Sequence, residues 1–349
     1  MTFQNRMKIP RPDDMHLHLR DGEVLKAVLP ESARHFARAI IMPNLQPPIA
    51  TGAQAAAYRD QIMAALPKDM EFTPLMTLYM TEDMDVEDMA AACHGGIISA
   101  VKLYPAGATT NSASGVRNID NVQHVFEKME EIGLPLCIHG EVADPGVDIF
   151  DREKEFLEKV RRIRLAFPNL KTVLEHITTS ESVEFVKEQD SGMAATITTH
   201  HMVLNRNHIL AGGIRPHYYC LPVAKREHHR KAVLKAAVSG HPSFFLGTDS
   251  APHIDSRKES PCGCAGCFTA TNTISILAEI FQRENALDNL ADFTSRNGAN
   301  FYGLPVSDST LELSHGAPVD YPEKIHTGEG TVTVFDPMMP LHWHVEIRN

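Results

Sequence analysis

The 349-residue sequence predicts a (β/α)₈ barrel of the TIM type with a short C-terminal extension. Eight short apolar runs, each typical of a buried strand, alternate with longer segments that are typical of helices. This order predicts a parallel sheet whose strands are joined by right-handed helical crossovers. No Gly-x-Gly-x-x-Gly turn follows any of the runs, which disfavours an open dinucleotide-binding sheet. Barrels of this kind often use a whole chain of this length, so we expect residues 1–349 to form one domain.

The first half of the predicted barrel begins with a strand that contains His16 and His18 and ends at a turn-forming Asp-Gly pair. A helical segment covers residues 23–36, and we expect Pro30 to break it. The pattern then predicts strands at 39–42, 72–80 and 97–104, and helices at 53–66, 86–92 and 122–132.

The second half repeats this alternation up to the eighth strand. Strands are predicted at 134–139, 171–177, 194–203 and 244–249, and helices at 153–166, 182–188 and 225–238. The helical segment 271–283 is an addition to the barrel. Residues 305–349 are rich in proline and show no sustained period, so we expect an irregular C-terminal tail.

One connection in the predicted barrel is unusually long. Residues 105–118 are small and polar and include two glycines, which is typical of mobile surface rather than core. A loop of this length inside a compact domain usually has a function.

Composition excludes several classes of protein. The formal net charge of −11 argues against a nucleic-acid partner, because phosphate binding needs a basic surface. No apolar run approaches the roughly 20 residues of a membrane span, and the polar N-terminus does not resemble a signal peptide. We therefore expect a cytoplasmic protein with no membrane partner, whose six cysteines are reduced. The 19 histidines are numerous and fit metal or acid–base chemistry.

His16 and His18 are separated by a single apolar residue at the end of the opening strand. On a helix such a pair would point about 200° apart, whereas on a strand both side chains project from the same face. Two interpretations remain open for the pair alone: half of a metal site, or two unrelated histidines on one strand.

Polar residues also end other predicted strands. Arg20 follows the histidine pair, and the further residues are Asn44, Lys102, His139, His176 and Asp249. The steps from 102 to 139 and from 139 to 176 are both 37 residues, and the step from 176 to 249 is 73 residues, close to two such units. Equivalent positions in a repeated βα unit lie on one rim of a barrel, where active sites are built. Four histidines and an aspartate on this rim match the ligand set of a zinc-dependent hydrolase.

Lys102 does not fit a simple metal site, because a protonated lysine repels a dication. It is either a substrate-binding cation or a rim residue whose amine reaches solvent. It can bridge two metal ions only as an anionic carbamate.

From Arg11 to about Leu304 the chain resembles the amidohydrolase superfamily and, within it, the bacterial homodimeric dihydroorotases. The matching stretches are Arg11-Pro-Asp-Asp-Met-His-Leu-His-Leu-Arg-Asp-Gly, Met42-Pro-Asn-Leu, Val101-Lys-Leu-Tyr-Pro-Ala, His139-Gly-Glu, Glu175-His-Ile-Thr-Thr and Gly247-Thr-Asp-Ser-Ala-Pro-His. The resemblance implies a barrel of the metal-dependent hydrolase kind that interconverts N-carbamoyl-L-aspartate and L-dihydroorotate in pyrimidine biosynthesis. It also implies a homodimer.

The resemblance further implies two zinc ions per subunit. His16, His18, Lys102 and Asp249 would surround one ion, and Lys102, as N6-carboxylysine, would hold the other together with His139 and His176. Asp249 would also act as the catalytic base and acid.

The family's substrate contacts map onto Arg20, Asn44 and His253, with backbone groups near Leu221 and Ala265. Arg20, two residues beyond His18 on the same strand face, would bind the carboxylate of the substrate. Thr109 and Thr110 in the long loop resemble the family's lid, whose closure excludes water.

Three further groups are expected to have no metal role. Cys262, Cys264 and Cys267 supply only three thiols, so we expect a reduced loop near the active site rather than a structural zinc site. His342 and His344 lie in the tail and are interpreted as surface residues. His200 and His201 end the seventh predicted strand; the sequence leaves open a position next to the ligands, and the resemblance does not make them ligands.

Two other functions remain as alternatives. Another cyclic amidohydrolase, such as a hydantoinase or allantoinase, would use the same barrel. A catalytically inactive barrel would serve as a scaffold, although every expected ligand position is filled.

Overall fold

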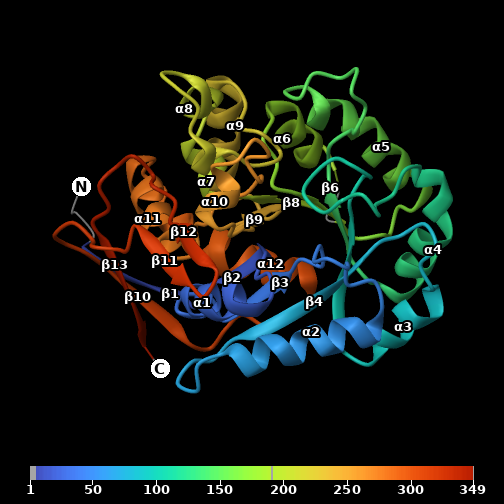
Figure 1. Ribbon diagram of the computed structural model, residues 1–349, viewed down its shortest axis with the longest axis horizontal. Helices are drawn as coiled ribbons and strands as arrows, with labels where there is room; N and C mark the ends of the chain where they lie inside the picture. The colour runs from blue at the N-terminus through green and yellow to red at the C-terminus, as the bar shows by residue number, and fades with distance from the viewer. Residues whose placement is uncertain (1–4, 190–191, 349) are drawn as a thin grey trace.

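The computed structural model describes residues 5–189 and 192–348, and an eight-stranded parallel sheet forms its centre (Figure 1). The strands follow one another in chain order: β2 (Asp13–Leu17), β3 (Arg38–Ile41), β4 (Thr73–Tyr79), β5 (Ile98–Leu103), β6 (Leu136–His139), β7 (Thr172–Glu175), β8 (Met193–Ile197) and β9 (Phe244–Leu246). The first and last strands meet through two backbone hydrogen bonds, from Asp249 N to His16 O (2.9 Å) and from His18 N to Ser250 O (3.2 Å). The sheet therefore closes into the expected barrel at the segments that carry the candidate ligands.

Helices follow the strands and surround the sheet (Figure 1). The crossover helices are α1 (Gly22–Ala33), α2 (Gly52–Ala65), α3 (Val86–His94), α4 (Gln123–Ile132), α5 (Arg152–Ala166), α6 (Ser180–Lys187) and α9 (Glu227–Val238). Shorter or additional helices are α7 (Thr199–Val203), α8 (Arg206–Leu210), α10 (Asp255–Lys258), α11 (Thr273–Arg283) and α12 (Asn297–Tyr302). Among the residues described, no helix combines the length and apolar composition needed to cross a membrane.

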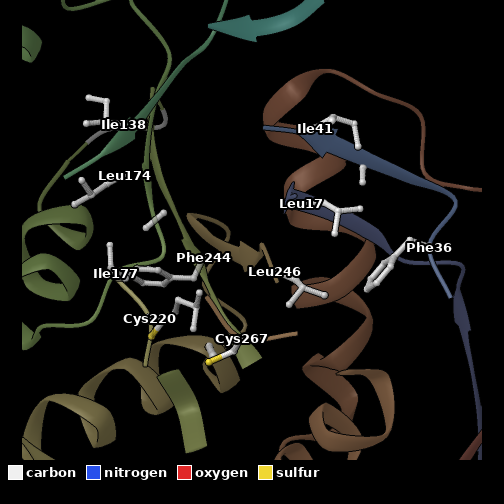
Figure 2. Close-up of a cluster of buried hydrophobic side chains, with 14 of the residues drawn as sticks. Leu17, Phe36, Ile41, Ile138, Leu174, Ile177, Cys220, Phe244, Leu246 and Cys267 are labelled. Carbon is white, nitrogen blue, oxygen red and sulfur yellow. The ribbon is translucent and has the colours of Figure 1, made fainter. Parts of the chain in front are cut away.

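The alternation of side chains along each strand divides the buried residues into two clusters. The smaller cluster consists of Met15, Ile40, Met42, Ala100, Cys137, Val173, Ala194 and Phe245, and Leu75 of β4 packs against it, so that all eight barrel strands contribute. The larger cluster packs between strands and helices, and Figure 2 shows part of it, including Leu17, Ile41, Ile138 and Leu174. Filling the barrel with side chains gives the rim a rigid base.

The C-terminal segment is not the irregular tail that its sequence suggested. β10 (Thr310–His315) pairs antiparallel with both β1 (Arg6–Pro10) and β13 (Trp343–Arg348), and β11 (Lys324–Thr327) pairs with β12 (Gly330–Thr333). The prediction failed because β10 finds one of its partners at the opposite end of the chain. Strands β1 and β13 consequently lie on the same side of the molecule, away from the crossover helices α3 to α5 (Figure 1).

Two further elements differ from the prediction. The strand expected at 194–203 ends at Ile197, because the Thr198 side chain accepts a hydrogen bond from His201 N and thereby caps α7. His200 and His201 are therefore helical. Pro30 does not break its helix but lies in the last turn of α1, where its carbonyl still accepts a 3.0 Å hydrogen bond from Arg34 N.

Candidate metal centre

Three potential ligand atoms converge where the barrel closes. His16 lies in β2, His18 follows that strand, and Asp249 comes three residues after the end of β9. His16 Nε2 is 3.2 Å from His18 Nε2, and the Asp249 Oδ1 atom is 3.3 Å and 3.0 Å from these two nitrogens. All three side chains are buried. The same-face placement expected for His16 and His18 is therefore present in the structure.

The backbone is strained at three candidate residues. Arg20, His176 and Asp249 have φ angles of 61°, 43° and 45°, in the left-handed region that non-glycine residues rarely adopt. Such strain clusters at functional sites, where the surrounding structure holds a side chain in a required direction. The expectation that Arg20 continues the strand face of His18 is wrong, because β2 ends at Leu17 and the backbone leaves the extended conformation at Arg20.

Gly247 leaves room for His16 beside β9. A Cβ atom at position 247 would lie 2.8 Å from His16 Cβ and 2.8 Å from Thr196 Cβ. Real Cβ atoms do not approach so closely, so a larger residue would displace the histidine. A glycine at this position therefore allows the close approach of two neighbouring strands at the site.

Lys102 lies at the end of β5 and is completely buried. Its amine contacts Glu175, whose carboxylate also lies 2.9 Å from His16 Nδ1. Burial lowers the pKa of Lys102 to about 7. A much larger fraction of the amine is therefore neutral at neutral pH than for a lysine in water. Glu175 was not selected from the sequence, although its position immediately before His176 and at the end of β7 could have indicated it.

His139 and His176 complete the group on the same rim. His139 is the last residue of β6, and its ring centroid is 4.8 Å from that of His176. The His176 ring is also 5.0 Å from the His16 ring, so the histidines form a connected set. Burial lowers the pKa of His176 well below its ordinary value, which favours the neutral imidazole that metals bind.

One small cavity brings together most of the predicted site residues. It is lined by His16, His18, Arg20, Asn44, Thr109, Thr110, His139, His176, Leu221, Asp249 and Ala265. Tyr104 lines the same cavity and was missed by the sequence analysis. Its buried hydroxyl has no hydrogen-bond partner among the described residues, and it follows Lys102 by two positions.

His253 contacts Arg20 beside this cavity. Arg20 Nη2 is 3.0 Å from His253 Nε2, and Arg20 Nε donates a 3.0 Å hydrogen bond to Pro252 O. The same Nε2 atom is 3.0 Å from Ala265 O, so it lies between a guanidinium donor and a carbonyl acceptor. Burial first, and the charge of Arg20 second, lower the pKa of His253 well below its ordinary value.

The loop at 105–118 lies against the cavity. Asn44 Nδ2 donates a 3.3 Å hydrogen bond to Thr110 O, and Asn111 Nδ2 donates a 2.9 Å hydrogen bond to Asn44 O. Asn44, three residues after β3, thus holds the loop at Thr110 and Asn111, and both Thr109 and Thr110 line the cavity.

A buried carboxylate supports the segment that follows His176. Glu153 in α5 accepts hydrogen bonds from Thr178 N (2.9 Å), Thr179 N (3.0 Å), Thr179 Oγ1 (2.7 Å) and Ser182 Oγ (2.6 Å). Burial alone would raise the pKa of Glu153, but Lys225 and these donors outweigh it and lower the pKa.

Replacing Glu153 by alanine should lower the free energy of unfolding by about 3 kcal/mol or more, because several buried donors lose their acceptor. Urea unfolding measures the change, and Glu155→Ala on the exposed face of α5 is the matched control. Since the folded pKa of Glu153 is lowered, its contribution is present above the unfolded pKa of about 4.3 and disappears as the pH falls through the folded pKa. If Glu153→Ala and Glu155→Ala lowered the free energy of unfolding equally, the proposed stabilising role of Glu153 would be wrong.

The donor set fits a metal ion. Ligands about 2.0 to 2.1 Å from a tetrahedral zinc ion are about 3.3 Å apart, and the three distances among His16, His18 and Asp249 are 3.0 to 3.3 Å. The nitrogens His18 Nδ1 and His176 Nδ1 are buried without a hydrogen-bond partner among the described residues. His16, Glu175 and His176 form a second group of potential ligands beside the first.

Comparisons with known proteins show the family of the chain. The amidohydrolase family model matches residues 13–313. Dihydroorotases from Cereibacter sphaeroides and Ruegeria sp. are 63% and 62% identical over 341 residues, each covering 97% of this chain and 99% of the relative. A dihydroorotase from Saccharomyces cerevisiae, solved in complex with 5-fluoroorotic acid, matches with a TM-score of 0.90 and 33% identity, covering 99% of both chains. The chain belongs to the amidohydrolase family and, within it, to the dihydroorotases.

Proposed function

We propose that the chain catalyses the reversible cyclisation of N-carbamoyl-L-aspartate to L-dihydroorotate and water, a step of pyrimidine synthesis. The observation that carries this proposal is the convergence of His16 Nε2, His18 Nε2 and Asp249 Oδ1 in a cavity that Arg20 also lines. Membership of the dihydroorotases supports it. The cavity thus combines a ligand set for metal-assisted amide hydrolysis with a cation for a carboxylated substrate.

Two zinc ions would be held by the histidines of this rim. His16, His18, Lys102 and Asp249 would hold one, and Lys102 as N6-carboxylysine would hold the second with His139 and His176. The carbamate would form at a buried amine whose lowered pKa favours the neutral, reactive form. When bound, zinc supplies a Lewis acid and lowers the pKa of its water from nearly 16 to about 7.

Asp249 would move the proton during ring opening. Its carboxylate would take a proton from the attacking water and deliver it to the leaving amide nitrogen, acting first as base and then as acid. Burial alone would raise the pKa of Asp249, but the imidazoles of His16 and His18 hold it well below its ordinary range. The carboxylate is therefore ionised and ready to accept the proton.

The other residues of the cavity would orient the substrate. Arg20 would bind its carboxylate through the guanidinium fork, with Asn44 and His253 beside it. Backbone groups of Leu221 and Ala265 would contact the ring. Thr109 and Thr110 would close the cavity as a lid and exclude water, which strengthens each electrostatic contact.

The assembly is part of the same proposal. We expect a single-domain subunit that forms a homodimer and works in the cytoplasm on a small-molecule substrate. Size-exclusion chromatography with light scattering measures the dimer directly.

An assay of ring opening tests the proposed substrate against the other cyclic amides. Zinc-loaded protein should hydrolyse L-dihydroorotate and leave hydantoin and allantoin largely intact, because neither of these rings carries the carboxylate that Arg20 would bind. Hydrolysis of hydantoin or allantoin without any turnover of L-dihydroorotate would assign the chain to another cyclic amidohydrolase. A fully loaded protein that opens no ring would indicate an inactive scaffold.

Replacing Arg20 by lysine should raise KM for dihydroorotate by about 10-fold or more while the zinc content stays unchanged. Lysine keeps the charge but loses the planar fork that pairs with a carboxylate and with His253 Nε2. Steady-state kinetics beside metal analysis measure both quantities, and Arg34→Lys on α1 is a matched control. An unchanged KM would show that Arg20 does not bind the substrate carboxylate.

A further inference from the structure

His200, Cys220 and Cys267 form a second group of potential metal ligands that does not include any residue of the candidate centre. A ring nitrogen of His200 and the two Sγ atoms all lie within 4.8 Å of one another. The three residues are 0%, 1% and 1% exposed. They come from α7, from the segment after Tyr218 and from the segment that bridges to Ser250, so the tertiary fold alone brings them together. Figure 2 shows Cys220 and Cys267 below Phe244.

His200 is the unusual member of this group. Neither Nδ1 nor Nε2 has a hydrogen-bond partner among the described residues, although the ring is completely buried. Leaving a buried polar group unpaired costs about 1 to 3 kcal/mol, and a neutral imidazole has both a donor and an acceptor to satisfy. Packing against His201 and Phe335 satisfies neither of them. We therefore infer that the His200 ring binds a partner other than the described residues.

The two thiols do not supply that partner. Cys220 Sγ lies 3.5 Å from Pro222 O and 3.3 Å from His201 Nε2, and Cys267 Sγ lies 3.5 Å from His217 O. A hydrogen bond with Cys267 and, second, burial raise the pKa of Cys220 well above its ordinary value. Without a metal both residues are weakly bonded thiols beside an imidazole that has no partner.

We propose that His200, Cys220 and Cys267 bind a structural transition-metal ion of the zinc class, separate from the catalytic ions. Each thiol releases its proton to solvent as its sulfur–metal bond forms, and a His200 nitrogen donates its lone pair. Tetrahedral zinc places two sulfurs about 3.8 Å apart and a sulfur and a nitrogen about 3.6 Å apart. The observed spread of at most 4.8 Å therefore needs only a small contraction.

His201 lies next to the cluster but already has partners of its own. Its Nε2 atom is 2.9 Å from Pro222 O, which only accepts, so Nε2 donates, and its Nδ1 atom is 2.9 Å from Thr198 Oγ1. His201 Nε2 is also 3.3 Å from Cys220 Sγ. The proposed ligand set is therefore Cys₂His, from His200, Cys220 and Cys267.

The proposed ion would lie next to two wall segments of the cavity at the candidate metal centre. Cys220 precedes Leu221, and Gly266 connects Ala265 to Cys267; Leu221, Ala265 and Gly266 all line the catalytic cavity. The ion would tie both segments to α7 and so fix two walls of that cavity. Lys258 Nζ already joins the same segments by donating hydrogen bonds to Tyr219 O (2.9 Å) and Gly266 O (2.8 Å).

The surface thiols provide a contrast within the same loop. Cys262 is exposed, and its Sγ atom is 3.9 Å from Cys264 Sγ. Cys267 instead lies in the core beside Cys220. The three-cysteine loop seen in the sequence therefore divides into two surface thiols and one buried ligand.

Cobalt substitution separates this ion from the catalytic centre. The full-length protein is stripped with a chelator under reducing conditions and titrated with Co²⁺, while thiolate-to-cobalt charge-transfer absorption is recorded in the near ultraviolet. The candidate catalytic ligands include no thiolate, so this absorption reports only cysteine-bound cobalt. We expect one thiolate-bound cobalt per chain in the wild type and a matching loss of one zinc equivalent in Cys220→Ser and Cys267→Ser.

His200→Gln keeps both thiols and tests the histidine separately. It should weaken cobalt binding by more than the roughly tenfold change typical of an outer partner, and Cys262→Ser should leave the absorption unchanged. Circular dichroism verifies that each variant is folded. Absence of the absorption in the wild type would overturn the proposal, as would its loss in Cys262→Ser or its persistence in folded Cys220→Ser and Cys267→Ser. Unchanged cobalt affinity in His200→Gln would also overturn the assignment of His200.

Discussion

Replacing Asp249 by asparagine is expected to lower kcat for dihydroorotate hydrolysis by about 10³-fold. The amide has nearly the same size and retains an oxygen near His16 and His18, which lie 3.3 Å and 3.0 Å from the present carboxylate oxygen. It cannot accept a proton from water and pass it on, and positioned proton transfer contributes about 10²- to 10⁴-fold to such reactions. Steady-state kinetics on metal-loaded protein measure the loss, and metal analysis verifies that both ions remain.

Asp255→Asn is the matched control for this substitution. Asp255 is also a largely buried aspartate, but its carboxylate accepts hydrogen bonds from Thr331 and Thr333 and pairs with Lys324. The control should therefore reduce stability and leave kcat near the wild-type value. If Asp249→Asn retained substantial turnover with its full metal content, the proton-transfer role of Asp249 would be wrong.

Replacing Lys102 by alanine is expected to abolish the bridged metal centre and nearly all turnover. The carbamate on Lys102 would supply an oxygen to each zinc ion, and an alanine side chain offers no ligand atom. Short carboxylic acids such as acetate can enter the space left by the buried side chain and should restore part of the activity. Metal content, activity and rescue are measured on the same preparation, and native mass spectrometry of the wild type should detect the added carbon dioxide.

Lys225→Ala controls for the loss of a buried lysine as such. Lys225 is 3% exposed and donates a 2.9 Å hydrogen bond to Val223 O, outside the candidate centre. This variant should keep its metal content. Two ions bound to Lys102→Ala with wild-type affinity would contradict the carbamate bridge.

Most of the rim was accessible to sequence analysis because the carboxyl ends of parallel strands gather at one end of a barrel. Asn44, His139, His176 and Asp249 each follow or end an apolar run, and the structure places all four around one cavity. Glu175 and Tyr104 were not selected as site residues, although Glu175 ends β7 and Tyr104 directly follows β5. The structure adds the contact of Glu175 with Lys102 and the unpaired buried hydroxyl of Tyr104, which involve the tertiary fold.

Local chemistry also misled the prediction at particular places. The apolar character of 194–203 suggested one continuous strand, but the capping bond of Thr198 converts its second half into α7. The C-terminal stretch lacked a clear pattern because β10 is stabilised by pairing with β1, far away in the chain. Such long-range pairing depends on the whole fold rather than on neighbouring residues.

The barrel, the family and the order of candidate ligands along the chain could all be predicted from the amino-acid sequence, because strand periodicity and strand ends are local properties. Which of the 19 histidines converge, and in what directions, became known from the three-dimensional structure. The structure gives Arg20 a left-handed backbone conformation, and it places Glu175 against Lys102 and Cys267 beside His200 rather than beside Cys262. The last two contacts join segments far apart in sequence, and their geometry is set by barrel closure and burial, which no local pattern encodes.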